Sequence, residues 1–164
     1  MLKILGIVLI FTASSYTGVF LSSLLSEKRE RLILIKKLIT EILSDLTFKK
    51  SETALLFQKL KNDKSYEKLH IFKSLNLSEK PIFIAFEDAV KSEMFLSAEE
   101  KSLLLSIAKI IGSTDSESQI NLLNFELKNL ENLIEKSAVD KEQKGKLFAS
   151  SGVLLGMFFA ILIL

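Results

Sequence analysis

The chain has no cysteine or tryptophan, and only one proline and one histidine among its 164 residues. Without cysteine there is no disulfide, no thiol nucleophile and no thiolate metal ligand. A single His70 does not supply the nitrogen ligands of a transition-metal site. The Gly-x-Ser-x-Gly and phosphate-loop motifs are also missing. We therefore expect no catalytic residue, no metal and no cofactor, and a protein that is not an enzyme.

A strong excess of either charge is also lacking. The 22 Lys and Arg residues nearly balance 20 Asp and Glu residues, for a net charge of +2. So small a net charge gives nucleic acid little attraction, and we expect no nucleic-acid partner. The positions of the charges are more informative. Apart from Lys3, every charged residue lies between Glu27 and Lys146, so two uncharged runs flank a charged middle.

Each uncharged run is long enough to cross a bilayer. Residues 4–26 and 147–164 are predominantly apolar, and about 20 helical residues span the hydrocarbon core. The sequence thus predicts an N-terminal transmembrane helix over 1–26, a helical domain over 27–146 and a C-terminal transmembrane helix over 147–164. The first run could instead be a cleaved signal peptide, with small residues at 12–15. Its continuation into a basic helix favours an uncleaved anchor.

Basic residues concentrate where the middle meets the two runs. The set at these membrane edges is Lys28, Arg29, Arg31, Lys144 and Lys146. The positive-inside rule then predicts a cytoplasmic middle, with both termini on the opposite side. The same cations can contact anionic headgroups of the lipid bilayer.

Small residues recur at every fourth position in both runs: Ser14, Gly18 and Ser22 in the first, Gly152, Gly156 and Ala160 in the second. Such stripes allow close helix packing in lipid, so we expect the spans to pair, although small residues are common in spans anyway. If the helices leave the membrane at Glu27 and Lys146, residues at equal depth below it have numbers that sum to roughly 173, which places Ile39 near Ile134 and Leu46 near Leu127.

Apolar residues in the middle follow helical spacing, with no sustained strand alternation. Two stripes have coiled-coil spacing: Leu32, Ile35, Ile39, Ile42 and Leu46 in the first, and Ile120, Leu123, Leu127, Leu130 and Ile134 in the second. We expect an all-α protein in which the terminal transmembrane helices flank a cytoplasmic six-helix bundle.

Shorter helices lie between these stripes. We expect them after a Ser51 cap, over 66–75, from Pro81, and from a Ser97–Glu100 capping box. Gly112 should end the last of them in the C′ position, while Ser113, Asp115 and Ser116 are alternative caps for the final helix.

The order of these features resembles the stage III sporulation protein AB family. The likeness rests on the opening Met-Leu-Lys-Ile-Leu-Gly, Gly18, Arg31-Leu32, Glu41-Ile42 and the Gly152/Gly156 span. It rests above all on Gly112-x-x-Asp115-x-x-x-Gln119, which follows Ile110 and Ile111. The chain departs from the family pattern after Phe48, where Lys-Lys-Ser-Glu-Thr replaces an expected aromatic residue and a Thr-Pro-Leu turn.

The resemblance implies a subunit of the channel between mother cell and forespore, in the mother-cell membrane around the forespore. It also implies a domain similar to that of type II secretion F proteins. The implied partners are a cytosolic secretion-type ATPase and other membrane subunits of the channel. The partner-binding candidates are Gly112, Asp115, Gln119 and Glu52, although Asp115 and Gln119 could serve only to cap the last helix. The alternative functions are a membrane-anchored signalling adaptor and, less favoured because the spans carry no charge, a membrane enzyme.

Overall fold

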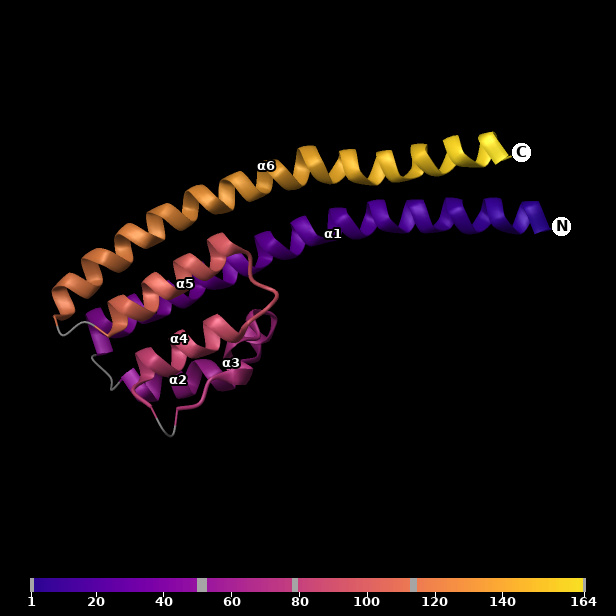
Figure 1. Cartoon of the computed structure of the whole chain (residues 1–164). Coiled ribbons are helices and arrows are strands. Elements are labelled where there is room, and N and C mark those ends of the chain that lie inside the picture. The colour runs from indigo at the N-terminus through magenta and orange to yellow at the C-terminus, as the bar shows by residue number, and fades with distance from the viewer. Residues whose placement is uncertain (1, 50–52, 78–79, 113–114, 164) are drawn as a thin grey trace. The chain divides into compact units, whose positions relative to one another are not determined.

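The computed structural model describes residues 2–49, 53–77, 80–112 and 115–163. Every regular element in these ranges is a helix, which confirms the all-α class (Figure 1). The chain divides into two compact units. Unit 1 comprises residues 1–30 and 134–164, and unit 2 comprises residues 31–133.

Two long helices contribute to both units. Helix α1 spans Leu2–Ser44 and helix α6 spans Ser116–Ile163. Both are long and apolar enough to cross a membrane, and most of their apolar windows are not buried by protein. In unit 1 these windows expose large side chains such as Leu9, Val19, Leu154 and Phe158. Such contiguous apolar surface is unusual on a soluble monomer, and it fits a lipid environment.

Unit 1 is held together by close contact between glycines. A Cβ atom added to Gly18 would lie 2.5 Å from the carbonyl oxygen of Phe148 and 3.0 Å from the Cα of Gly152. One added to Gly152 would lie 2.7 Å from the carbonyl oxygen of Ser14. The Ser14 hydroxyl donates a hydrogen bond to the Gly152 carbonyl at 2.7 Å. The two helices therefore approach backbone to backbone, which only glycine permits at these positions.

The register of this pair follows from its small residues. Gly18 meets Gly152, and Ser22 meets Gly145. The expected pairing of Ile39 with Ile134, at equal heights below the membrane, stays a prediction. In the structure the glycines set the register, since backbone contact is possible only where they face each other.

Unit 2 combines parts of α1 and α6 with shorter helices. These are α2 (Thr53–Asn62), a 3₁₀ helix η2 (Lys64–Leu69), α3 (Ile71–Ser74), α4 (Ile82–Ser92) and α5 (Ala98–Ile111). The core contains the predicted stripe residues Leu32, Ile35, Ile39, Ile42, Leu123 and Leu130. Full burial of one such side chain contributes about 1.5–3 kcal/mol. The count of six helices and the cytoplasmic location stay predictions.

Two local predictions need correction. The helix expected over 66–75 is interrupted at His70, whose φ of 51° is left-handed, so that η2 and α3 are separate elements. This break lets Ile71 be buried together with Tyr66, which an unbroken helix would place on different faces. Pro81 is the N-cap of α4 and not its first helical residue. Helix α1 ends at Ser44 in a π-helical turn, Asp45–Lys49. The predicted Ser51 cap lies outside the described residues.

Candidate functional site

The connection between α5 and α6 contains the predicted Gly/Asp/Gln element. The Asp115 carboxylate accepts a hydrogen bond from the backbone N–H of Ser118 at 2.9 Å, so Asp115 caps α6. Hydrogen bonds from the side chain and backbone of Ser118 lower the pKa of Asp115. The choice among the three predicted caps is thereby settled by local hydrogen bonding, while the Asp115 side chain remains exposed.

Gln119 and Gly112 fix the same connection from inside. Gln119 is only 8% exposed, and its Nε2 donates to the carbonyl oxygen of Ile111 at 3.4 Å. Gly112 ends α5 as predicted, but it is the C-cap, with a φ of −77°, and does not occupy the C′ position. Its role is steric, because an added Cβ would lie 2.9 Å from Cγ of Phe83 in α4. The element thus joins α4, α5 and α6 within unit 2.

In the structure, the Gly/Asp/Gln element connects two helices. Its partner-binding role stays a prediction. Asp115 is the member whose charged group is accessible, whereas Gln119 is buried. Glu52, the remaining candidate, lies outside the described residues. Any contact with a partner at this element would therefore depend mainly on Asp115.

Exposed apolar side chains lie on the elements beside this connection. Phe48 follows the end of α1 and is 82% exposed, and Phe125 on α6 is 62% exposed. Leu122, one turn before Phe125, is also exposed. Figure 1 shows the end of α1 and the start of α6 at the same end of unit 2. Sequence reasoning missed these residues, although Leu122 and Phe125 both fall outside the apolar stripe of their helix.

Charged residues on α1 fasten the shorter helices of unit 2. Arg31 donates from Nε to Oε1 of the fully buried Glu100 at 2.9 Å. The Tyr66 hydroxyl donates to Glu41 at 2.9 Å, and Lys37 lies 4.7 Å from the centre of the Tyr66 ring. Burial and the contact with Glu41 raise the pKa of Tyr66. The membrane-edge role of Arg31 stays a prediction, although its guanidinium is engaged by a protein carboxylate.

A hollow of about 490 Å³ lies at η2 in unit 2. Its lining mixes the cations Lys61, Lys64 and Lys73 with Asp63 and Glu67. His70 also lines it, with its ring centre 5.7 Å from that of Phe95. Within the described ranges no group of three His, Asp or Glu residues could hold a metal ion. The hollow shows no arrangement of acid, base and nucleophile.

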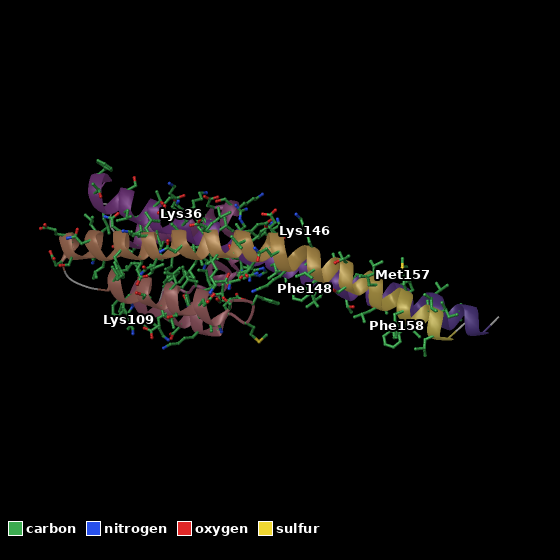
Figure 2. All side chains as sticks on the ribbon, turned by 90° about the horizontal axis from the view of Figure 1, so that it is seen from above. Lys36, Lys109, Lys146, Phe148, Met157 and Phe158 are labelled. Atoms are coloured by element: carbon green, nitrogen blue, oxygen red, sulfur yellow. The ribbon has the colours of Figure 1, made fainter. Side chains whose placement is uncertain are left out.

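The remaining membrane-edge cations lie in unit 1. Lys144 pairs with Asp140 at 2.7 Å, and this contact lowers the pKa of Asp140, to which Lys28 also contributes. Lys146 lies 3.4 Å from Glu142, while Arg29 lines a groove between the two helices of the unit. Figure 2 shows the polar atoms of α6 giving way to carbon after Lys146, towards the labelled Phe148, Met157 and Phe158.

These features define an all-α protein with two apolar terminal helices that pack through glycines and with a helical unit fastened by buried polar contacts. One family model covers nearly the whole chain: residues 3–164 match stage III sporulation protein AB. The chain belongs to this family, and it is a stage III sporulation protein. No curated protein and no solved structure matches it. The likeness to type II secretion F proteins stays a prediction.

Proposed function

We propose that this protein is a non-enzymatic membrane platform of the sporulation channel between mother cell and forespore. In this role it docks a cytosolic secretion-type ATPase and contacts other membrane subunits of the channel. Membership of the stage III sporulation protein AB family supports the place in sporulation. The observation that supports docking is the exposure of three large apolar side chains, Phe48, Leu122 and Phe125, on elements at one end of unit 2 (Figure 1).

The proposed topology is multi-pass, with both long helices crossing the mother-cell membrane around the forespore. Unit 2 lies in the cytoplasm. The basic residues beside both uncharged runs support this orientation. The lack of cysteine makes it testable, because a single Ser92→Cys variant carries the one thiol of the protein. With the variant produced in the plasma membrane of vegetative cells, an impermeant maleimide should label that thiol only after the protoplasts are opened; labelling of intact protoplasts would contradict the topology.

The proposed docking surface consists of Phe48, Leu122 and Phe125 with Asp115 beside them. Interfaces commonly bury aromatic anchors inside a polar rim, and a few such anchors supply most of the binding energy. Leu122 and Phe125 are three residues apart and so share one face of α6. Asp115 adds a negative charge at the start of the same helix, opposite which a basic side chain of the ATPase could lie.

Co-purification with the secretion-type ATPase from sporulating cells tests docking. Phe125→Asp should reduce recovery of the ATPase by tenfold or more, the order expected for loss of a buried aromatic anchor. The matched control is Asn124→Asp, which introduces the same residue at an exposed neighbouring position. Equal recovery with both variants would contradict this surface. Failure of the folded wild-type protein to retain any ATPase in mild detergent would favour the signalling adaptor.

A further inference from the structure

A groove in unit 1 lies where the uncharged runs meet the charged middle. It has a volume of about 440 Å³. Ser22 and Arg29 of α1 form one wall, and residues 138–149 of α6 form the other. Ser22 belongs to the uncharged run of its helix, whereas the α6 wall contains the last charged turn before residue 147. The groove therefore joins the two kinds of surface on one side of the unit.

Small residues on α6 leave the space for this groove. Ala138, Gly145 and Ala149 line it, separated by seven and then four positions, which places them along one helix face. At Gly145 an added Cβ would lie 3.1 Å from the Ser22 hydroxyl oxygen. The floor is thus made by small side chains, and the polar groups around it come from longer ones.

Arg29 is the residue that indicates a ligand. Its Nε is buried and has no hydrogen-bond partner among the described residues. Two positions further on, the same atom of Arg31 is satisfied by Glu100 at 2.9 Å. A buried cationic donor without an acceptor is unfavourable, and native structures almost always satisfy such groups. Because Arg29 also lines the groove, a turn of its side chain towards the groove would let an acceptor from outside the chain satisfy this donor.

The charges of the groove favour an anion. Arg29, Lys141 and Lys146 are positive, and Glu142 is the acidic residue among the lining side chains. Glu142 accepts a hydrogen bond from Lys146 at 3.4 Å on the exposed side of the helix. A guanidinium, two ammonium groups and the hydroxyl of Ser22 together suit the oxygens of a phosphate group.

We propose that this groove binds the phosphate of an anionic phospholipid headgroup. The proposal rests on the proposed membrane insertion of both long helices. An anionic lipid is favoured over free phosphate because Ser22 and Ala149 continue the groove into the uncharged runs, where an acyl chain can follow the headgroup. A phosphate there supplies the missing acceptor for Arg29 and reduces repulsion among the three cations.

The test uses the full chain in a mild neutral detergent, titrated with phosphatidylglycerol and analysed by native mass spectrometry. Arg29→Gln keeps most of the side-chain length but removes the charge. It should weaken phosphatidylglycerol binding about tenfold, the order expected for one charge-assisted hydrogen bond. The matched control is Lys144→Gln, because Lys144 is a membrane-edge cation that pairs with Asp140 and does not line the groove. Binding by this control should equal that of the wild type.

Further measurements distinguish an anionic phospholipid from a zwitterionic lipid and from free phosphate. Phosphatidylcholine should bind at least tenfold more weakly than phosphatidylglycerol, and inorganic phosphate should not displace the lipid beyond the effect of sodium chloride at equal ionic strength. Equal losses in Arg29→Gln and Lys144→Gln would overturn the proposal, as would displacement by phosphate. If Arg29→Gln loses helicity by circular dichroism, Lys141→Gln carries the test with the same expected outcome. The single-thiol labelling experiment tests the topology separately.

Discussion

Arg31 and Glu100 are 69 positions apart, yet they form an ion pair in which both guanidinium Nε and one terminal nitrogen donate to the carboxylate, at 2.9 and 3.4 Å. Glu100 also accepts a hydrogen bond from the backbone N–H of Ser97 at 2.7 Å, as part of the capping box of α5. One carboxylate thus starts α5 and attaches it to α1. The capping role of Glu100 is indicated by its spacing from Ser97 in the sequence. Its attachment to Arg31 of α1 is seen only in the structure.

Replacement of Glu100 by alanine should therefore destabilise unit 2 strongly. Loss of one partner from a buried ion pair costs about 3–5 kcal/mol, because the other charge is left without compensation. Denaturant unfolding of the full chain in detergent micelles, followed by circular dichroism, measures the change. Glu99→Ala at the exposed neighbouring position is the control and should cost less than about 1 kcal/mol. Equal losses would contradict the role of the Arg31–Glu100 pair.

Alanine at Gly18 should weaken the packing of unit 1. The new Cβ would lie 2.5 Å from a backbone oxygen, which cannot move aside as a side chain can, and overpacking of this kind costs about 1–3 kcal/mol. Gly6 is a matched control, because nothing lies within 4 Å of an added Cβ there. Thermal unfolding in detergent should show a lower midpoint for Gly18→Ala and an unchanged or higher midpoint for Gly6→Ala. The same midpoint in both variants would disprove the glycine contact.

Tyr66 should make the stability of unit 2 sensitive to alkaline pH. Burial first, and then the contact with Glu41, raise its pKa, whereas a tyrosine in the unfolded chain ionises near pH 10. The stabilising contribution is therefore complete below about pH 10 and is lost as pH rises above that value. Tyr66→Phe should reduce the fall in unfolding free energy between pH 9 and 11. If the unfolding free energies of the wild type and Tyr66→Phe changed with pH in parallel, Tyr66 would have the same pKa in the folded and unfolded states, against this prediction.

Substitutions at Asp115 separate its cap from its proposed contact with a partner. Asp115→Ala should lower the unfolding free energy by about 1 kcal/mol, since it removes the acceptor for Ser118, while Asp115→Asn keeps an acceptor and should cost a few tenths. Asp115→Asn nevertheless removes the charge. Reduced ATPase recovery with this stable variant would support a docking role, and unchanged recovery would leave Asp115 as a cap alone.

Elements whose signals are local were predictable from the sequence. The Ser97–Glu100 box and the stripe from Leu32 to Ile42 appear in the structure because spacing along one helix determines them. The break at His70 was not predictable, because it depends on burial of both Tyr66 and Ile71 against the rest of unit 2. For the same reason the steric role of Gly112 required knowledge of where Phe83 packs.

The candidate site divides in the same way. Asp115 and Gln119 were found from a sequence pattern, whereas the exposed Phe48 and Phe125 were recognised only once the buried face of each helix was known. The unsatisfied Nε of Arg29 could not be inferred at all, because the sequence shows its neighbour Arg31 as an equivalent cation. Long-range contacts distinguish the two arginines.

The contact between Ser22 and Gly145 has a consequence for the geometry of the protein in a bilayer. The charged turn of α6 that ends at Lys146 lies beside an uncharged turn of α1, from Ser22 to Ser26. If both helices cross the bilayer as proposed, a boundary at right angles to their axes would place either the last charged turn of α6 in hydrocarbon or the turn from Ser22 to Ser26 in water. Tilting of the pair, with α6 raised towards the headgroups, keeps the lysines in water and the apolar side chains in lipid.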